Sequence, residues 1–183
     1  MSDSTNKEMA QQDTFEGILK DGGIERGVLT EFTASVLQPN NFSEAIALPL
    51  SGTPMVLAAL TGAQALGLDA GDRVWLTGTV GWRAVANGTG VTRADVMFRI
   101  FRNAPVTGLQ VFSIRESAES GFDNFEATSF DHIDINPAAD GNMLVSYFLT
   151  AELPLAGSAA TVIGPVTFMA SELKPGLKLS CCD

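Results

Sequence analysis

Hydrophobic and polar residues alternate with a period of two along much of the chain, most clearly between Gly71 and Asn103. In the first half of this stretch the large apolar residues share one face: Val74, Leu76, Val80 and Trp82. The intervening positions place Trp75, Thr77 and Thr79 on the other face. This period is that of a pleated strand, whereas a helix repeats about every 3.6 residues. The pattern predicts two strands, residues 73–82 and 95–102, separated by a turn whose glycines can adopt positive φ.

The second of these strands carries large apolar side chains on both faces. One face holds Val96, Phe98 and Ile100. The other face holds Met97 and Phe101. A strand of this kind either lies between two packed sheets or turns one face to a partner subunit. We expect another copy of the chain to cover Met97 and Phe101, with Trp75 contributing to the subunit interface.

Further segments alternate in the same way and are separated by turn-forming residues: 42–50, 108–116, 125–135, 143–153 and 159–173. The pair Gly164-Pro165 predicts a bulge or bend within the last segment. Residues 54–68 fit a helix and two short strands about equally well, because Gly62 and Gly67 interrupt the apolar spacing. Short strands with polar turns and almost no helix predict an all-β fold, a jelly roll or β-sandwich.

The two ends of the chain differ from this central region. Residues 1–14 are polar and predict a tail. Residues 15–37 are apolar but interrupted by glycines, which predicts short strands or an extended N-terminal arm. Such an arm can pack on its own subunit or on a neighbour, and Ile18, Leu19 and Phe32 are its interface candidates. The expected organisation is therefore a tail and arm over residues 1–41, a jelly-roll domain over 42–173 and a short C-terminal tail over 174–183.

Composition limits the partners of the chain. It has 45% hydrophobic and 17% charged residues, and its formal net charge is −10. Nucleic acids and anionic membranes are unexpected partners because both require clustered Lys and Arg. No apolar run approaches the roughly 18 residues that span a bilayer. The polar start of the chain lacks the apolar segment of a signal peptide, so we expect synthesis in a cytoplasm.

The two cysteines, Cys181 and Cys182, are adjacent and lie beside the C-terminus. Neighbouring cysteines bridge each other only with poor disulfide geometry, and two sulfurs are too few for a closed zinc site. Two readings stay open. The thiols are exposed and inert, or they form disulfides between subunits in an oxidising final location.

No catalytic constellation stands out, and we expect a protein that is not an enzyme and needs no cofactor. Asp131, Asp134 and Asp140 offer carboxylates for a cation, but their spacing matches no calcium loop, so solvated loop charge is the preferred reading. His132 lacks a nucleophile-elbow motif nearby. Six aromatic residues would suit a sugar-stacking platform, although a core or subunit-interface position is the preferred reading: Trp75, Trp82, Phe98, Phe101, Phe112 and Phe148.

Three segments, GDRVWLTGTVGWRAVA, MFRIFRN and ATVIGPVTFMASEL, resemble a family of small exosporium or spore-surface proteins of spore-forming Firmicutes. The strand order is similar, more distantly, to the trimeric jelly roll of tumour-necrosis-factor-like and complement-like domains. The resemblance implies a structural role at a spore surface, in trimers or larger assemblies. It supplies no active-site residues, and this chain has no Gly-X-Y tract.

These observations predict a self-assembling structural subunit of a bacterial spore surface layer or appendage. Its partners would be copies of itself, in a trimer, a higher assembly or a fibre, together with other spore-surface proteins. It would be made in the mother-cell cytoplasm and deposited on the spore, where Cys181 and Cys182 would cross-link subunits. The alternative is a jelly-roll module that binds carbohydrate or another ligand, with calcium as a candidate helper.

Overall fold

The computed structural model describes residues 28–38, 47–120, 125–139, 141 and 143–175. The predictions for Ile18, Leu19, Asp140, Cys181 and Cys182 lie outside these residues. The strands are β1 (Val28–Leu37), β2 (Leu48–Pro49), β3 (Met55–Leu60), β4 (Leu66–Gly67), β5 (Arg73–Ala84), β6 (Arg93–Arg102), β7 (Leu109–Glu119), β8 (Phe125–Ile135), β9 (Leu144–Val145), β10 (Tyr147–Glu152) and β11 (Ala160–Lys174). One 3-10 turn, Gly62–Gln64, separates β3 from β4.

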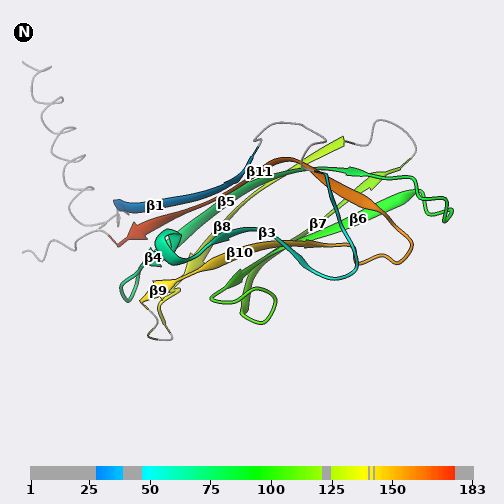
Figure 1. Ribbon diagram of the computed structural model, residues 1–183. Helices are drawn as coiled ribbons and strands as arrows, with labels where there is room; N and C mark the ends of the chain where they lie inside the picture. The colour runs from blue at the N-terminus through cyan, green and yellow to red at the C-terminus, as the bar shows by residue number, and fades with distance from the viewer. Residues whose placement is uncertain (1–27, 39–46, 121–124, 140, 142, 176–183) are drawn as a thin grey trace, which may run out of the picture. The chain divides into compact units, whose positions relative to one another are not determined.

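The long strands form two antiparallel sheets that lie one over the other (Figure 1). The first sheet has the order β1-β11-β5-β8, with β2 also paired to β11, and the second has the order β3-β10-β6-β7. Strands that follow one another in the chain mostly alternate between the sheets, so each sheet is completed by distant segments. This is the jelly-roll form of the β-sandwich that the strand pattern predicts.

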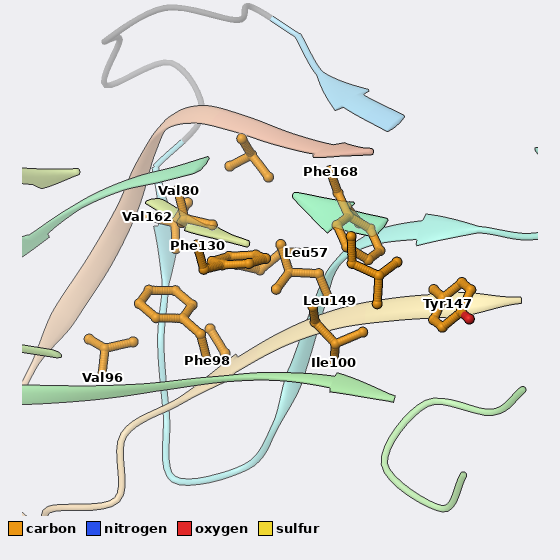
Figure 2. Close-up of a cluster of buried hydrophobic side chains, with 14 of the residues drawn as sticks. Leu57, Val80, Val96, Phe98, Ile100, Phe130, Tyr147, Leu149, Val162 and Phe168 are labelled. Carbon is orange, nitrogen blue, oxygen red and sulfur yellow. The ribbon is translucent and has the colours of Figure 1, made fainter. Parts of the chain in front are cut away.

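The core lies between the sheets and confirms the predicted faces of β5 and β6. Val74, Leu76, Val80 and Trp82 of β5 are fully buried. So are Val96, Phe98 and Ile100 of β6. Figure 2 shows side chains from both sheets, among them Val80, Phe168, Phe98 and Leu149, filling the space between them. Each fully buried side chain of this size contributes about 1.5–3 kcal/mol through the hydrophobic effect.

The expectation that another copy covers Phe101 is wrong, because a single chain already leaves only 6% of it exposed. Phe101 pairs with Phe148 on β10 and with Gln110 on β7. A register shift in the β6–β7 ladder falls between Ile100 and Phe101. This bulge breaks the period of two, so consecutive residues at the end of β6 become buried.

Met97 is half-buried on a face that ion pairs occupy. Its same-face neighbours along β6 are Asp95 and Arg99. Arg99 pairs with Glu152 on β10. Asp95 is fully buried and is bound by Arg93, Arg115 and Ser117. Met97 therefore lies between two groups of charges that the chain neutralises by itself.

The segment 54–68, for which the sequence allowed either a helix or two short strands, contains two strands. Strand β3 covers residues 55–60, and strand β4 covers residues 66–67. Strand β4 pairs with β9 in a separate two-stranded sheet. The strand expected over 143–153 divides into β9 and β10 on either side of Ser146. The predicted bend at Gly164-Pro165 is present, because the β11–β5 register shifts between Val162 and Val166.

Part of the expected N-terminal arm belongs to the jelly roll. β1 is hydrogen-bonded beside β11, and Leu29–Lys174 form one compact unit. The domain therefore begins before residue 42, the expected boundary. A strand that pairs with its own subunit's sheet is the own-subunit arrangement that the sequence allowed for residues 28–37.

Candidate functional site

The outer face of the first sheet carries a regular grid of side chains from β11, β5 and β8. Three residues that are neighbours across the strands form each row: Ser171, Trp75 and Ile133; Met169, Thr77 and Asp131; Thr167, Thr79 and Ser129. Rows of same-face residues are about 7 Å apart along a strand, and neighbouring strands are about 4.8 Å apart. The grid follows from the alternation that buries Val74, Leu76 and Val80 on the opposite face.

A pocket of about 490 Å³ is lined in part by this grid. Its outer-face lining includes Trp75, Thr77, Thr79, Ser129, Asp131 and Met169. The rest of its lining comes from residues that face the space between the two sheets: Gly78, Phe112, Ile114 and Phe130. Trp75 is 44% exposed, and the Thr79 and Ser129 hydroxyl oxygens lie 3.1 Å apart. The pocket thus combines an accessible aromatic ring with hydroxyl and carboxylate groups.

A buried polar network surrounds Asp134, near the C-terminal end of β8. Asp134 Oδ2 accepts a hydrogen bond from the Tyr147 hydroxyl at 2.9 Å and lies 3.3 Å from Arg102 Nη1. Burial and the Asp134 carboxylate raise the pKa of Tyr147, so the phenol remains a proton donor. The network satisfies three buried polar side chains, which makes it part of the framework of the fold.

Asp131 and Asp134 do not form a shared cation site. Asp131 is exposed on the outer face of β8, whereas Asp134 is buried between the sheets with Arg102 and Tyr147. The described residues contain no group of three His, Cys, Asp or Glu side chains arranged to hold a metal ion. Asp131 and Asp134 therefore point to opposite faces of β8.

A second acidic site joins β1 to β11. Glu172 is 2% exposed, and its Oε2 accepts a hydrogen bond from Thr30 Oγ1. Lys174 Nζ lies 3.6 Å from Glu172 Oε1 and 3.0 Å from Asp69 Oδ2. Burial, together with the nearby Asp72 carboxylate, raises the pKa of Glu172. This site ties an edge strand to the sheet and responds to pH.

One side of the sandwich has a long edge strand from each sheet. β8 ends the order of the first sheet, β7 ends that of the second, and both strands have 11 residues. No other strand among the described residues pairs with the outer side of either one. Edge strands of this length offer backbone N–H and C=O groups to another extended segment.

Five exposed apolar residues lie at or near the end of the sandwich where β7 begins and β8 ends. They are Val106, Leu109, Ile135, Met143 and Leu144. The β6–β7 loop reaches the β9–β10 junction through the hydrogen bond from Asn103 N to Ser146 O, 2.8 Å long. Ile135 directly follows Asp134, which contacts Arg102 and Tyr147 at the same end. We call these five residues the end cluster.

The interface candidates from the sequence have different surroundings. Trp75 and Phe32 are exposed, Met97 is half-buried among ion pairs, and Phe101 is buried. His132 is half-buried, with its ring 5.5 Å from that of Phe112. The end cluster and the Asp134 network were missed because each joins residues that are far apart in the chain. The Asp95 network was missed because Arg115 and Ser117 reach Asp95 only through the pairing of β6 with β7, although Arg93 is two residues away. The sequence signal that could have pointed to the end cluster was the presence of hydrophobic residues at the ends of strands.

A comparison with protein families finds no match, and a comparison with curated proteins finds none either. Among solved structures, an arabinose-bound GH51 α-L-arabinofuranosidase is similar with 15% identity and a TM-score of 0.36, over 84% of this chain and 23% of that one. Latent PorU from Porphyromonas gingivalis has 14% identity and a TM-score of 0.38, over 82% and 14%. The VP2 subviral particle of infectious bursal disease virus has 12% identity and a TM-score of 0.37, over 83% and 44%.

The chain spans less than half the length of each of these solved chains. At such identities and TM-scores the similarities carry no functional conclusion. In the part of the chain that the structure describes, no helix is long and apolar enough to cross a membrane.

Proposed function

We propose that this protein is a non-enzymatic structural subunit that assembles with copies of itself through the open edges of its sandwich. The observation that carries the proposal is the pair of long edge strands, β7 and β8, on the same side of the fold. Backbone pairing along such edges joins β domains without a specialised active site.

The end cluster supports the same contact. Ile135 is 71% exposed and Leu109 is 58% exposed, and each lies on one of the two open edge strands. Burying them in a subunit contact would add hydrophobic stabilisation to the backbone hydrogen bonds. A contact of ordinary stability buries about 1,600 Å² in total, which two 11-residue edges and the end cluster together would help to supply.

The opposite edges of the sandwich are β1 and β3. Pairing the β7 and β8 side of one copy with the β1 and β3 side of the next is a head-to-tail contact. Such contacts produce rings when the rotation closes and fibres when it does not. Both outcomes agree with the trimer or higher assembly expected from the sequence.

The proposal also includes the place where the protein assembles. Deposition on a bacterial spore rests on the resemblance of the three quoted sequence segments alone. Cross-linking by Cys181 and Cys182 rests on their adjacent position in the sequence and needs an oxidising location. Neither is required for the edge contact itself.

The test combines two charge insertions on the open side, Leu109→Lys and Ile135→Lys, with mass photometry of the full chain. The control is Leu155→Lys, which changes an exposed apolar residue in the loop between β10 and β11. We expect the double variant to yield smaller species than the wild type, while the control assembles normally. A wild-type protein that remains a monomer, or a double variant that assembles as the wild type does, would contradict the proposal.

A further inference from the structure

The two tryptophans of the chain have opposite surroundings. Trp82 is fully buried, and its Nε1 donates a hydrogen bond to Thr128 Oγ1 at 3.0 Å. Trp75 instead lies on the outer face of the first sheet, where it is part of the pocket lining and has nearly half of its surface exposed. The core therefore accounts for Trp82, whereas Trp75 stands on the outer face between Ser171 and Ile133 and outside the core.

We propose that the Trp75 pocket is a binding site for a neutral saccharide. One face of a pyranose ring presents C–H groups, which pack against the flat apolar surface of an indole. The ring edges present hydroxyls, which need hydrogen-bond partners beside that surface. A pocket that recognises such a ligand needs an apolar platform and a small number of polar groups.

The sheet register supplies these polar groups beside the tryptophan. One row along from Trp75 lie the Thr77 hydroxyl and the Asp131 carboxylate, and the following row holds Thr79 and Ser129. The first of these rows is about 7 Å from Trp75 along the strand, and the second about as far again. A carboxylate accepts hydrogen bonds from sugar hydroxyls, and Thr and Ser hydroxyls both donate and accept them.

The charge of the pocket and of the chain determines which saccharides can bind. The described pocket lining contains Asp131 and no Lys or Arg, and the chain as a whole has a net charge of −10. Uronic acids, sialic acids and phosphorylated sugars would be repelled. Neutral hexoses and pentoses, and chains built from them, are the ligand class that remains.

The same chemistry argues against a second copy of the chain as the occupant of this pocket. Covering Thr77, Thr79, Ser129 and Asp131 with apolar side chains would remove hydroxyls and a carboxylate from water without replacing their hydrogen bonds. A saccharide replaces those bonds. The proposal is therefore independent of the subunit contact assigned to the β7 and β8 edges.

Titration of the full chain with neutral oligosaccharides tests the site, with tryptophan fluorescence as the readout. The probes are xylotetraose, cellotetraose, chitotetraose and mannotetraose, and sialyllactose is the anionic comparison. Because Trp75 is exposed and Trp82 is buried, ligand binding should change the emission of Trp75 selectively. We expect saturable binding of at least one neutral probe and none of sialyllactose.

Variants assign the binding to the pocket. Trp75→Ala removes the fluorescence reporter, so its binding is measured by isothermal titration calorimetry and should be at least tenfold weaker. Asp131→Ala should weaken binding severalfold while keeping the fluorescence reporter. Phe32→Ala, which removes an exposed aromatic ring from β1, should bind as the wild type does. Mass photometry of the same variants should show unchanged assembly, which separates this proposal from the edge contact.

The proposal is overturned if none of the four neutral probes binds, or if Trp75→Ala and Asp131→Ala both bind as tightly as the wild type. It is also overturned if Trp75→Ala abolishes assembly while no probe changes the fluorescence, because the face would then be a subunit interface. Should Trp75→Ala fail to fold, the Asp131→Ala titration decides alone.

Discussion

Gly78 of β5 and Phe130 of β8 are paired in the sheet register, and the phenyl ring occupies the space that a side chain at position 78 would fill. A Cβ at Gly78 would lie 2.4 Å from Phe130 Cζ and 2.9 Å from Phe130 Cε2. The Phe130 ring in turn stacks on Phe112 of β7, with ring centroids 5.3 Å apart. The absence of one side chain thus lets an aromatic pair connect the two sheets near their open side.

Gly78→Ala should therefore destabilise the fold by about 1–3 kcal/mol, because the methyl group displaces Phe130 from its contact with Phe112. Urea unfolding followed by circular dichroism measures the change in the free energy of unfolding. Gly67→Ala is the matched control, since a Cβ there would meet nothing within 4 Å. Equal stability of the two variants would show that the ring moves at no cost.

Asp95 should make the fold sensitive to acid. The hydrogen bond from Arg93, with others from Ser117 and Arg115, outweighs burial and holds the pKa of Asp95 well below its ordinary value of 3.8. A pKa that is lower in the folded state means that the stabilisation is fully present above 3.8 and is lost as the pH falls below it.

Asp95→Asn should remove this part of the acid dependence and lower the stability at neutral pH. Thermal melts between about pH 2 and pH 7 compare the slopes of wild type and variant. Asp131→Asn, an exposed carboxylate on β8, is the control for loss of charge alone. Parallel acid limbs for the wild type and Asp95→Asn would refute the assignment.

Glu172 should act in the opposite direction. Burial, with help from Asp72, raises its pKa above the ordinary value of 4.5, so the protonated form is favoured in the folded state. The resulting stabilisation is present below 4.5 and is lost as the pH rises through the raised pKa. Glu172→Gln imitates the protonated form.

This variant should be more stable than the wild type at neutral pH, and the difference should shrink as the pH falls. Its amide can still accept the Thr30 hydrogen bond through Oε1, so the tie between β1 and β11 is kept. Chemical unfolding at neutral and acidic pH measures the two differences. A variant that is less stable than the wild type at neutral pH would show that the charged form is the stabilising one.

The cysteine pair yields a prediction from sequence alone. If Cys181 and Cys182 link subunits, assemblies should resist detergent and release smaller species when reductant is added. Gel electrophoresis with and without reductant provides the measurement. The double variant Cys181→Ser and Cys182→Ser should behave in both gels like the reduced wild type. Identical gel patterns of the wild type with and without reductant would show that the thiols do not link subunits.

The sequence was most informative where a strand is regular. The alternation through β5 and the first half of β6 predicted which residues fill the core, because a pleated strand turns every second side chain inward. It failed at Phe101, where a register shift in the β6–β7 pairing changes which side chains turn inward. A bulge of this kind depends on the partner strand, which a single alternating segment does not reveal.

The sequence alone could not predict which side chains surround Trp75, because that depends on which distant strands pair. The grid around Trp75 exists because β11, β5 and β8 are neighbours, although they are distant in the chain. Alternation predicted that Trp75 shares a face with Thr77 and Thr79, but Asp131 and Ser129 join them only through the sheet register. Alternation along β8, rather than pairing, separates Asp131 from Asp134, which the sequence analysis had grouped as candidate cation ligands.

Sedimentation velocity of the wild-type chain over a hundredfold range of concentration tests the central claim most directly. The account predicts species larger than a monomer that grow with concentration, since subunits join through the β7 and β8 edges. A single monomeric species at every concentration, in reducing and in oxidising buffer, would contradict it.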